Sequence, residues 1–160
     1  MMIAYLESKR VNQKFIGGLL VVDERGIPME FKYTDPIIPN ELQKILYGGS
    51  LEVYLKSELI AKTLMKKMEK NPDFIFIRDP ELLEVDPRLI LISEKKERLE
   101  KPLRISEEEA FLPFRGNAIR IVGKLSDEQL EKLMNLLENF DVLEPFQRLD
   151  KALDYVCSGE

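Results

Sequence analysis

The feature that most constrains the fold is a strand, turn and strand pattern near the amino terminus. Residues 15–23 read FIGGLLVVD, a leucine- and valine-rich run that predicts a strand. Gly26 follows at the last position of a turn, where a positive φ costs glycine little. Residues 27–33 then place an apolar side chain at every second position, so we expect a β-hairpin with one covered face. The apolar residues expected on that covered face are Ile27, Met29, Phe31 and Tyr33.

A proline-framed segment follows the hairpin and leads into a short helix. Residues 34–39 read TDPIIP, in which each proline fixes its own φ and biases the preceding residue toward extended geometry. Asn40 and Gln43 have the spacing of a capping box, in which each side chain bonds to the backbone of the other residue. We therefore expect a rigid connection and then a helix over residues 41–47.

A longer helix is expected immediately after the first. Gly48 or Gly49 should end the first helix in the left-handed conformation, and Ser50 should cap the next one. Residues 51–70 carry a broad arc of apolar side chains at helical spacing, with polar residues opposite. An arc of this breadth indicates a helix that is largely buried against a sheet.

Two short apolar runs predict central strands. Residues 74–77 read FIFI and residues 89–92 read LILI, and neither run alternates with polar residues, as is typical of strands covered on both faces. Asp79 and Pro80 begin a short helix between the two runs, so a parallel pair of strands fits the pattern. At the amino terminus, the run MIAYL predicts a further strand, whereas polar residues 7–14 predict a loop.

The charged segment EKKERLEK at residues 94–101 predicts an exposed loop and is the strongest candidate for a boundary within the chain. Beyond it we expect a strand over residues 103–105, a brief helical turn that begins at Ser106, and a second strand over residues 117–122. Two helices should follow, one capped by Ser126 and one over residues 145–156. The whole pattern predicts an α+β fold. It comprises a mixed sheet starting with an N-terminal hairpin, a long central helix packed on the sheet, and two C-terminal helices, in a single domain over residues 1–160 with a sub-division near residues 94–101.

The absence of histidine and the single cysteine narrow the chemistry. Ser-His-Asp and Cys-His catalysis and His-ligated zinc are excluded, and Cys157 alone forms no disulfide within one chain. Acid–base catalysis would fall to Asp, Glu, Lys, Tyr or Cys. No phosphate-binding loop, dinucleotide fingerprint, nucleophile elbow or EF-hand loop occurs in the sequence. Whether the chain is an enzyme is therefore undecided, and we assign no catalytic residue, no cofactor and no metal ligand.

Two polar features were weighed as sites and given structural roles. Carboxylates follow the FIFI run, where α/β enzymes place metal ligands, but Asp79 suits a helix cap and Glu81 a first helical turn. The segment from Gly48 to Ser50 precedes a helix start, where backbone N–H groups can hold an anion, but glycine corners between helices are common.

The net charge of −5 argues against a nucleic-acid partner. A duplex-binding surface needs clustered lysine and arginine, whereas the basic pairs Lys66-Lys67 and Lys95-Lys96 are interrupted by acids. No run of 18 apolar residues and no signal-peptide pattern occurs, so we expect a cytoplasmic protein. The 33% content of charged residues resembles the composition of thermophile proteins.

The candidate site lies between the hairpin and the first helix. Polar groups there stand on a rigid frame with tyrosines close by, as in pockets for a small ligand or peptide. Gly17 and Gly18 inside a strand indicate a bulge, tight helix packing or the close approach of a ligand. The candidate ligand-binding residues are Gly17, Gly18, Glu30, Lys32, Thr34, Asp35, Asn40 and Tyr47. A well-capped connection with no ligand is the alternative interpretation of the same residues.

The stretch GGLLVVDERGIPMEFKYTDPIIPNELQKILYGGSLEVYL resembles the signature of an uncharacterised bacterial protein family. Its members share a G-x-P-x-E-F hairpin and a following P-N-x-x-Q-x-x-L-Y-G helix. The resemblance covers about residues 15–65 of this chain. The resemblance implies no catalytic residues. The hairpin also resembles roadblock-type and sensor-type modules, although those place a helix before the hairpin, where this chain has the strand-like run MIAYL.

These observations lead to one expected function and two alternatives. We expect a cytoplasmic module that binds a ligand or a protein, with a homo-oligomer or another protein as partner. The first alternative is a small enzyme that uses carboxylates and Lys32. The second is a nucleic-acid-associated protein, which the acidic charge disfavours.

Overall fold

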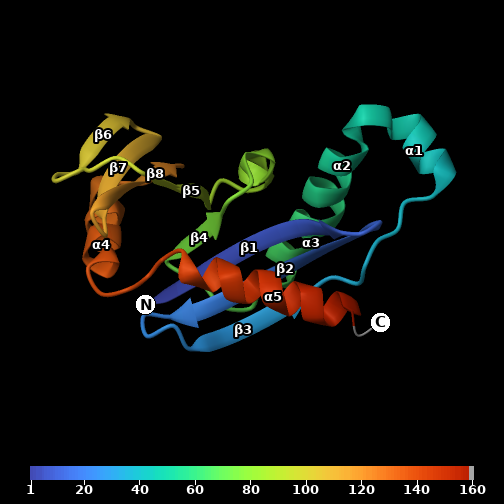
Figure 1. The fold of residues 1–160 in the computed structure, drawn as a ribbon, viewed down its shortest axis with the longest axis horizontal. Helices are drawn as coiled ribbons and strands as arrows, with labels where there is room; N and C mark the ends of the chain where they lie inside the picture. The colour runs from blue at the N-terminus through green and yellow to red at the C-terminus, as the bar shows by residue number, and fades with distance from the viewer. Residues whose placement is uncertain (159–160) are drawn as a thin grey trace.

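The computed structural model describes residues 1–158, in which eight strands form one mixed sheet (Figure 1). The strand order across the sheet is β3-β2-β1-β4-β5-β8-β7-β6. In chain order the strands are β1 (Met2–Val11), β2 (Lys14–Asp23), β3 (Pro28–Tyr33), β4 (Phe74–Ile77), β5 (Leu89–Lys95), β6 (Leu103–Ser106), β7 (Glu109–Phe114) and β8 (Asn117–Val122). The first three strands form an antiparallel meander, and β4 and β5 then run parallel to β1 on its other side. The expected α+β class and the parallel pair are confirmed.

The helices are α1 (Glu41–Tyr47), α2 (Leu51–Tyr54), α3 (Lys62–Lys67), α4 (Asp127–Leu137) and α5 (Glu144–Ser158). A π-helical segment, η2 (Leu55–Ala61), joins α2 to α3, so the expected long helix is one continuous run. Two 3-10 segments, η1 (Gly48–Ser50) and η3 (Pro80–Val85), complete the list.

Helix α1 begins and ends largely as its sequence predicts. Asn40 and Gln43 form the capping box, and Gly48 adopts a positive φ of 52° where the helix ends. The prediction that Ser50 caps the next helix is wrong. Its hydroxyl donates to the Tyr47 carbonyl, because the chain continues through a 3-10 turn instead of breaking between the helices.

The predicted loop over residues 7–14 is wrong, because β1 continues to Val11. The whole strand, including its polar second half, pairs with β2 from Met2 opposite Asp23 to Val11 opposite Lys14. Polar residues are stable in this strand because their side chains have charged partners: Glu7 pairs with Arg78, and Lys9 with carboxylates of α5.

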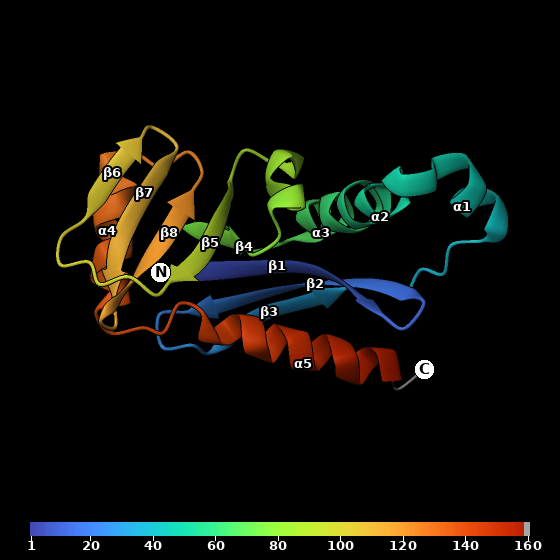
Figure 2. The same cartoon turned by 45° about the horizontal axis from the view of Figure 1, so that its top comes forward.

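The helices cover both faces of β1 and β2, as Figure 2 shows, with α5 on one side and the α2–α3 run on the other. Gly18 lies beneath α5, where an added Cβ would come within 2.8 Å of Leu149 and Leu153. Gly17 lies beneath the π-helical segment, where an added Cβ would meet Ile60 at 2.0 Å. The two glycines therefore allow a helix to approach each face of the same strand.

The two faces of β3 are reversed relative to the prediction. The carboxylate of Glu30 is only 6% exposed and accepts the backbone N–H groups of Glu69 and Lys70. Phe31 and its apolar neighbours are exposed instead, because α5 packs on β1 and β2 and leaves β3 uncovered. The strand is thus attached to the end of α3 through hydrogen bonds to a carboxylate, and its apolar side faces outward.

The helical turn predicted from Ser106 is also wrong, because the chain forms β7 there. Ala110, Leu112 and Phe114 alternate and are buried, so the segment satisfies the pattern of a half-buried strand. Arg115 and Gly116, both at positive φ, make the two-residue turn into β8.

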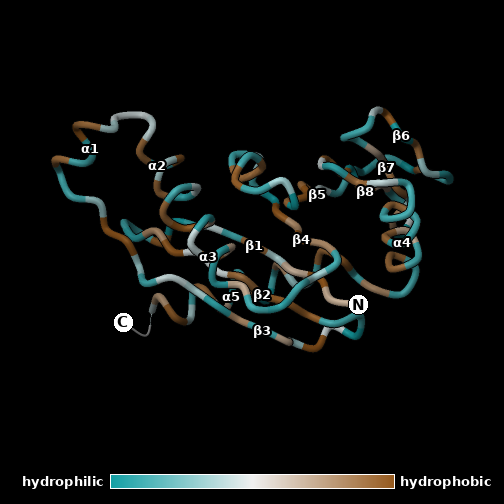
Figure 3. Tube along the Cα trace, turned by 180° about the vertical axis from the view of Figure 1, so that it is seen from behind, coloured by the Kyte–Doolittle hydropathy of each residue, from teal (hydrophilic) through white to brown (hydrophobic). Residues whose placement is uncertain are grey.

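Helix α1 stands away from the sheet. None of its residues is buried, and Leu42, Ile45 and Leu46 are among its exposed side chains. In Figure 3 the hydrophobic colouring follows the sheet and recurs on this distant helix. Among residues 1–158, no helix is both long enough and apolar enough to cross a membrane.

Candidate functional site

The carboxyl ends of the parallel strands β1, β4 and β5 meet beside one another in the sheet. In β1 and β4 the paired register ends at Tyr5 opposite Phe76, so Glu7 and Arg78 are neighbours two residues further along. The order in which strands are added to the sheet reverses at this point, because β2 lies on one side of β1 and β4 lies on the other. Open sheets with parallel strands bind ligands in the crevice at such a switch point. This edge is therefore the first place to look for a site.

Glu7 and Arg78 form a half-buried ion pair at this edge. Nη2 of Arg78 donates to Oε1 of Glu7, and the Glu7 side chain is 14% exposed. Its second oxygen, Oε2, is buried and accepts no hydrogen bond from residues 1–158. Burial raises the pKa of the Glu7 carboxyl above its ordinary value, although Arg78 opposes the shift. The carboxylate is thus held by a single partner.

Arg78 lines a hollow of about 540 Å³ between the end of β4, β5 and the start of α5. Its Cζ lies 4.6 Å from the centre of the Phe146 ring, which supports the guanidinium plane. The Arg78 side chain is 44% exposed, and Glu7 is its hydrogen-bond acceptor among the described residues. N–H donors therefore remain for a ligand in the hollow.

A second arginine lines the same hollow. Arg115 lies in the turn between β7 and β8, and its guanidinium lies over the Phe114 ring at 5.4 Å. Its Nη1 donates to Oδ2 of Asp141 at 3.1 Å. Two arginines, each with its guanidinium near an aromatic ring, thus line one hollow, and planar guanidinium forks match phosphate oxygens well.

The donor set does not suit a divalent cation. Residues 1–158 contain no group of three or more Asp, Glu, His or Cys side chains that could hold one. At the strand edge Glu7 is engaged by Arg78. Asp79 binds Nζ of Lys56 at 2.8 Å and accepts the N–H of Glu81, so its predicted role as a helix cap is confirmed.

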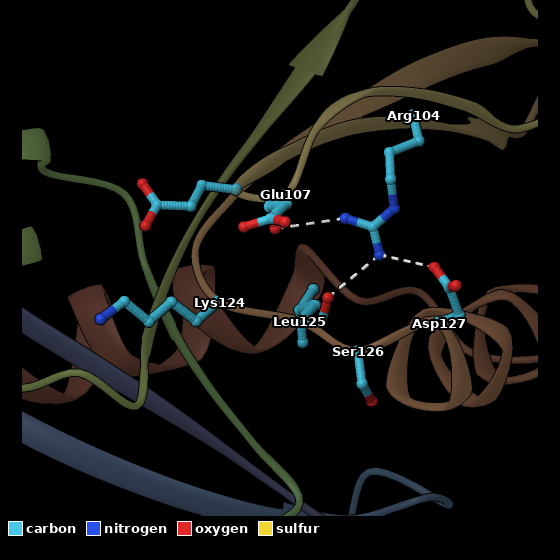
Figure 4. Close-up of a pocket in the computed structure, with 7 residues that line it drawn as sticks. Arg104, Glu107, Lys124, Leu125, Ser126 and Asp127 are labelled. Atoms are coloured by element: carbon cyan, nitrogen blue, oxygen red, sulfur yellow. Dashed lines mark hydrogen bonds and ion pairs between the residues drawn. The ribbon is translucent and has the colours of Figure 1, made fainter.

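Another hollow, between the turn after β6 and the start of α4, is lined by Arg104, whose hydrogen bonding differs from that of Arg78 (Figure 4). Arg104 donates to the carbonyls of Ser106, Glu107 and Leu125 and to the Asp127 carboxylate. These bonds join the turn to the helix start. The N–H donors of Arg104 are therefore bound to acceptors of its own chain, whereas most N–H donors of Arg78 have no acceptor among the described residues.

The site residues predicted from the sequence form two pairs and otherwise lie apart from one another. Gly17 donates its N–H to Oγ1 of Thr34 at 3.0 Å, while Gly18 packs under α5. Glu30 and Lys32 lie together beside Glu69, with Lys32 Nζ 3.1 Å from that carboxylate.

The remaining predicted residues lie further along the chain. Asp35 is in the connection after β3, Asn40 caps α1, and Tyr47 stacks on Tyr54 at 4.6 Å. The structure thus brings Glu30 and Lys32 together, and Gly17 with Thr34, but does not gather the eight residues around one hollow. Their ligand-binding role stays a prediction.

Sequence reasoning missed Glu7, Arg78 and Arg115. The sequence pattern predicts a loop at Glu7 and a helix cap at Asp79, one residue beyond Arg78. A usable signal was present, since a charged residue directly after a buried parallel strand lies at the ligand-binding edge of the sheet. Arg115 gave no such signal, because its place depends on the β7–β8 turn.

Comparison with known proteins identifies the fold. No protein-family model matches the sequence, and no curated protein matches it. Among solved structures, endonuclease V from Streptomyces avermitilis matches with a TM-score of 0.61 and 10% identity, covering 99% of this chain and 82% of that one. Endonuclease V from Bacillus subtilis matches with a TM-score of 0.57, 12% identity and coverage of 99% and 82%. The chain has the fold of endonuclease V.

A third match is a structure that contains bound nucleic acid. Endonuclease V from Ciona intestinalis, in complex with a 24mer DNA that contains inosine, has a TM-score of 0.55, 9% identity and coverage of 99% and 87%. Against these matches, the predicted ligand- or protein-binding module and the prediction of no nucleic-acid partner are wrong. The matches favour the nucleic-acid alternative. The prediction rested on net charge, which sums over the whole surface and does not report how charges are arranged locally.

Proposed function

We propose that this chain binds nucleic acid, with a phosphate of the backbone in the hollow beside Arg78. The observation that carries the proposal is the Arg78 guanidinium, which stands at the carboxyl end of β4 with donors left free. Further support comes from the fold, since structures of the same fold include an endonuclease V complex with DNA.

The chemistry of the hollow suits one or two phosphates. Hydrogen bonds between ionised arginine and phosphate are about twice as strong as those between neutral groups. Arg115 supplies a second guanidinium, and Ser93 and Gln147 line the same hollow with neutral polar groups. Glu94, Asp141 and Glu144 also line it and would repel phosphates placed beside them. This mixture favours a backbone of low charge density, so single-stranded nucleic acid is the proposed ligand class.

The test is binding of fluorescein-labelled single-stranded DNA and RNA, followed by fluorescence anisotropy. Arg78→Gln, which keeps a donor facing Glu7, should weaken binding about tenfold or more, because it removes the charge that meets the phosphate. Arg98→Ala is the control, since Arg98 is an exposed arginine that does not line the hollow. Equal affinity of Arg78→Gln, Arg98→Ala and the wild type would refute the proposed site. A cytoplasmic location, expected from the sequence, stays a prediction.

A further inference from the structure

The pairing of Glu7 with Arg78 bears on how the site holds an anion. Nucleases and polymerases commonly hold divalent cations between carboxylates, and the cations neutralise the phosphate that reacts. Mg²⁺ is typically bound through one or two carboxylates together with oxygens of the substrate phosphate. In this chain one carboxylate, Glu7, lies in β1 two residues beyond the last residue that pairs with β4, but its neighbour across the β1–β4 pair is an arginine.

We infer that the Arg78 guanidinium occupies the position of a divalent cation beside Glu7, and that the site holds phosphate without a metal ion. The inference rests on the proposed function for the nature of the ligand. The claim about the cation concerns the protein alone and can be tested without nucleic acid.

Burial and neighbouring charges both keep a metal ion from Glu7. One oxygen of Glu7 accepts from Arg78, and the side chain is largely covered. The nearest carboxylates on α5 are neutralised already, because Nζ of Lys9 lies 2.8 Å from Asp150 and 2.7 Å from Asp154. Glu7 belongs to no group of three or more Asp, Glu, His or Cys side chains among the described residues that could hold a cation.

The same contacts prepare Arg78 to meet a phosphate. Glu7 fixes one end of the guanidinium, and the Phe146 ring supports its plane. Arg78 lines the hollow and its guanidinium is already held in place, so little side-chain freedom is lost when an anion binds. Glu7 and Phe146 are positioning residues in this arrangement, and Arg78 makes the contact.

The first experiment measures thermal unfolding of the full chain in EDTA and in MnCl₂. The wild-type Tm should not change. Arg78→Asp places a second carboxylate beside Glu7, so its Tm should rise in MnCl₂, and Glu7→Gln combined with Arg78→Asp should abolish the rise. Two results would overturn the inference: a wild-type Tm that rises in MnCl₂ and no longer does so in Glu7→Gln, or a folded Arg78→Asp variant that shows no response.

The second experiment needs no variant and decides the matter even where Arg78→Asp does not fold. Affinity of the wild type for single-stranded DNA is measured in EDTA and in MgCl₂ at matched ionic strength. The two dissociation constants should agree within about twofold, whereas a gain of about tenfold or more in MgCl₂ would overturn the inference. Absence of binding in both buffers would refute the proposed function, and the manganese experiment would still decide whether Arg78 fills a cation position.

Discussion

Arg78 and Arg104 each line a hollow of this molecule, and their hydrogen bonds separate a binding role from a structural role. Arg104 has four acceptors from its own chain, so its donors are largely used in joining a turn to a helix. Arg78 has one acceptor among the described residues and lines its hollow with its other donors unpaired there. Because an arginine carries five N–H groups, the number left unused is a direct measure of what it can still bind.

The Glu7–Arg78 pair gives the first prediction. Arg78→Met should lower the free energy of unfolding at neutral pH by about 2 kcal/mol, because it leaves a largely buried carboxylate without its partner. The folded-state pKa of Glu7 is already raised by burial and would rise further in the variant. A carboxyl with a raised folded-state pKa destabilises the fold as the pH rises through the unfolded value, so the deficit should shrink on acidification.

Urea unfolding at neutral pH and near pH 5 measures this effect. Glu7→Gln combined with Arg78→Met is the control, since it removes the unpaired charge and should recover most of the loss at neutral pH. A deficit that is the same at both pH values would show that the stability lost is packing on Phe146 and not charge burial.

The two adjacent glycines of β2 give the second prediction. Gly17→Ala should destabilise the protein by about 2 kcal/mol, because its Cβ would meet Ile60 at 2.0 Å. Gly18→Ala should cost less, since the nearest atoms are the flexible ends of Leu149 and Leu153 at 2.8 Å. Gly49→Ala is the control, as nothing lies within 4 Å of its Cβ position. Thermal unfolding measures how much stability each variant loses, and equal losses for Gly17→Ala and Gly49→Ala would contradict the prediction.

At the scale of elements, Asp73 ties the start of β1 to α4 and gives the third prediction. Its carboxylate accepts from the Met2 N–H at 3.0 Å and from Nζ of Lys132 at 2.6 Å. Burial alone would raise the pKa of Asp73, but these hydrogen bonds outweigh it, so the pKa lies below the ordinary value of 3.8. An acid whose folded-state pKa is lowered contributes stability above its unfolded pKa, and the contribution is lost as the pH falls through the folded value.

Asp73→Asn should therefore cost about 1 kcal/mol at neutral pH and progressively less below pH 3.8. Chemical denaturation across an acid pH series measures the difference. Lys132→Met is the companion variant and should show the same convergence with the wild type in acid. A difference between Asp73→Asn and wild type that persists at the lowest pH would show that the aspartate acts through shape and not charge.

Most elements could be predicted from local pattern, and the failures have a common physical cause. The hairpin, the buried β4 and β5 and the capping box of α1 are determined by residues close in sequence. The second half of β1 was missed because its polar residues are stabilised by partners on distant elements, such as Asp150 for Lys9. The faces of β3 were reversed for the same reason, since the partner of Glu30 is backbone near the end of α3. Local pattern cannot report a stabilising partner that is far along the chain.

The site was predictable only in part. The FIFI strand ends at the edge of the sheet where Glu7 and Arg78 meet, but their contact spans 71 residues of sequence and no local pattern indicates it. Arg115 reaches the hollow because a turn at positive φ follows β7, a strand that the sequence pattern did not indicate. The eight predicted ligand-binding residues share a stretch of sequence but occupy separate parts of the fold.

At the scale of the whole molecule, the acidic net charge gives the fourth prediction. A ligand contacted by two arginines displaces few counterions, so the logarithm of the binding constant should fall with the logarithm of salt concentration with a slope of about −1.4 for single strands. Titrations over a range of NaCl concentrations measure this slope, and Arg115→Gln should reduce it by about half. A slope several times steeper would mean that basic groups outside the hollow carry the binding.

The packing of α5 on β1 joins the two ends of the described chain in space. The hydroxyl of Tyr5 donates to the carbonyl of Val142 at 2.6 Å, and Lys9 reaches Asp150 and Asp154. A ribosome synthesises β1 long before α5, so the growing chain carries one bare side of its central strands until α5 emerges. Glu7 and Gly18 are open to water throughout that interval. Chaperones that hold exposed apolar strands should therefore engage this protein during translation and release it once α5 has docked.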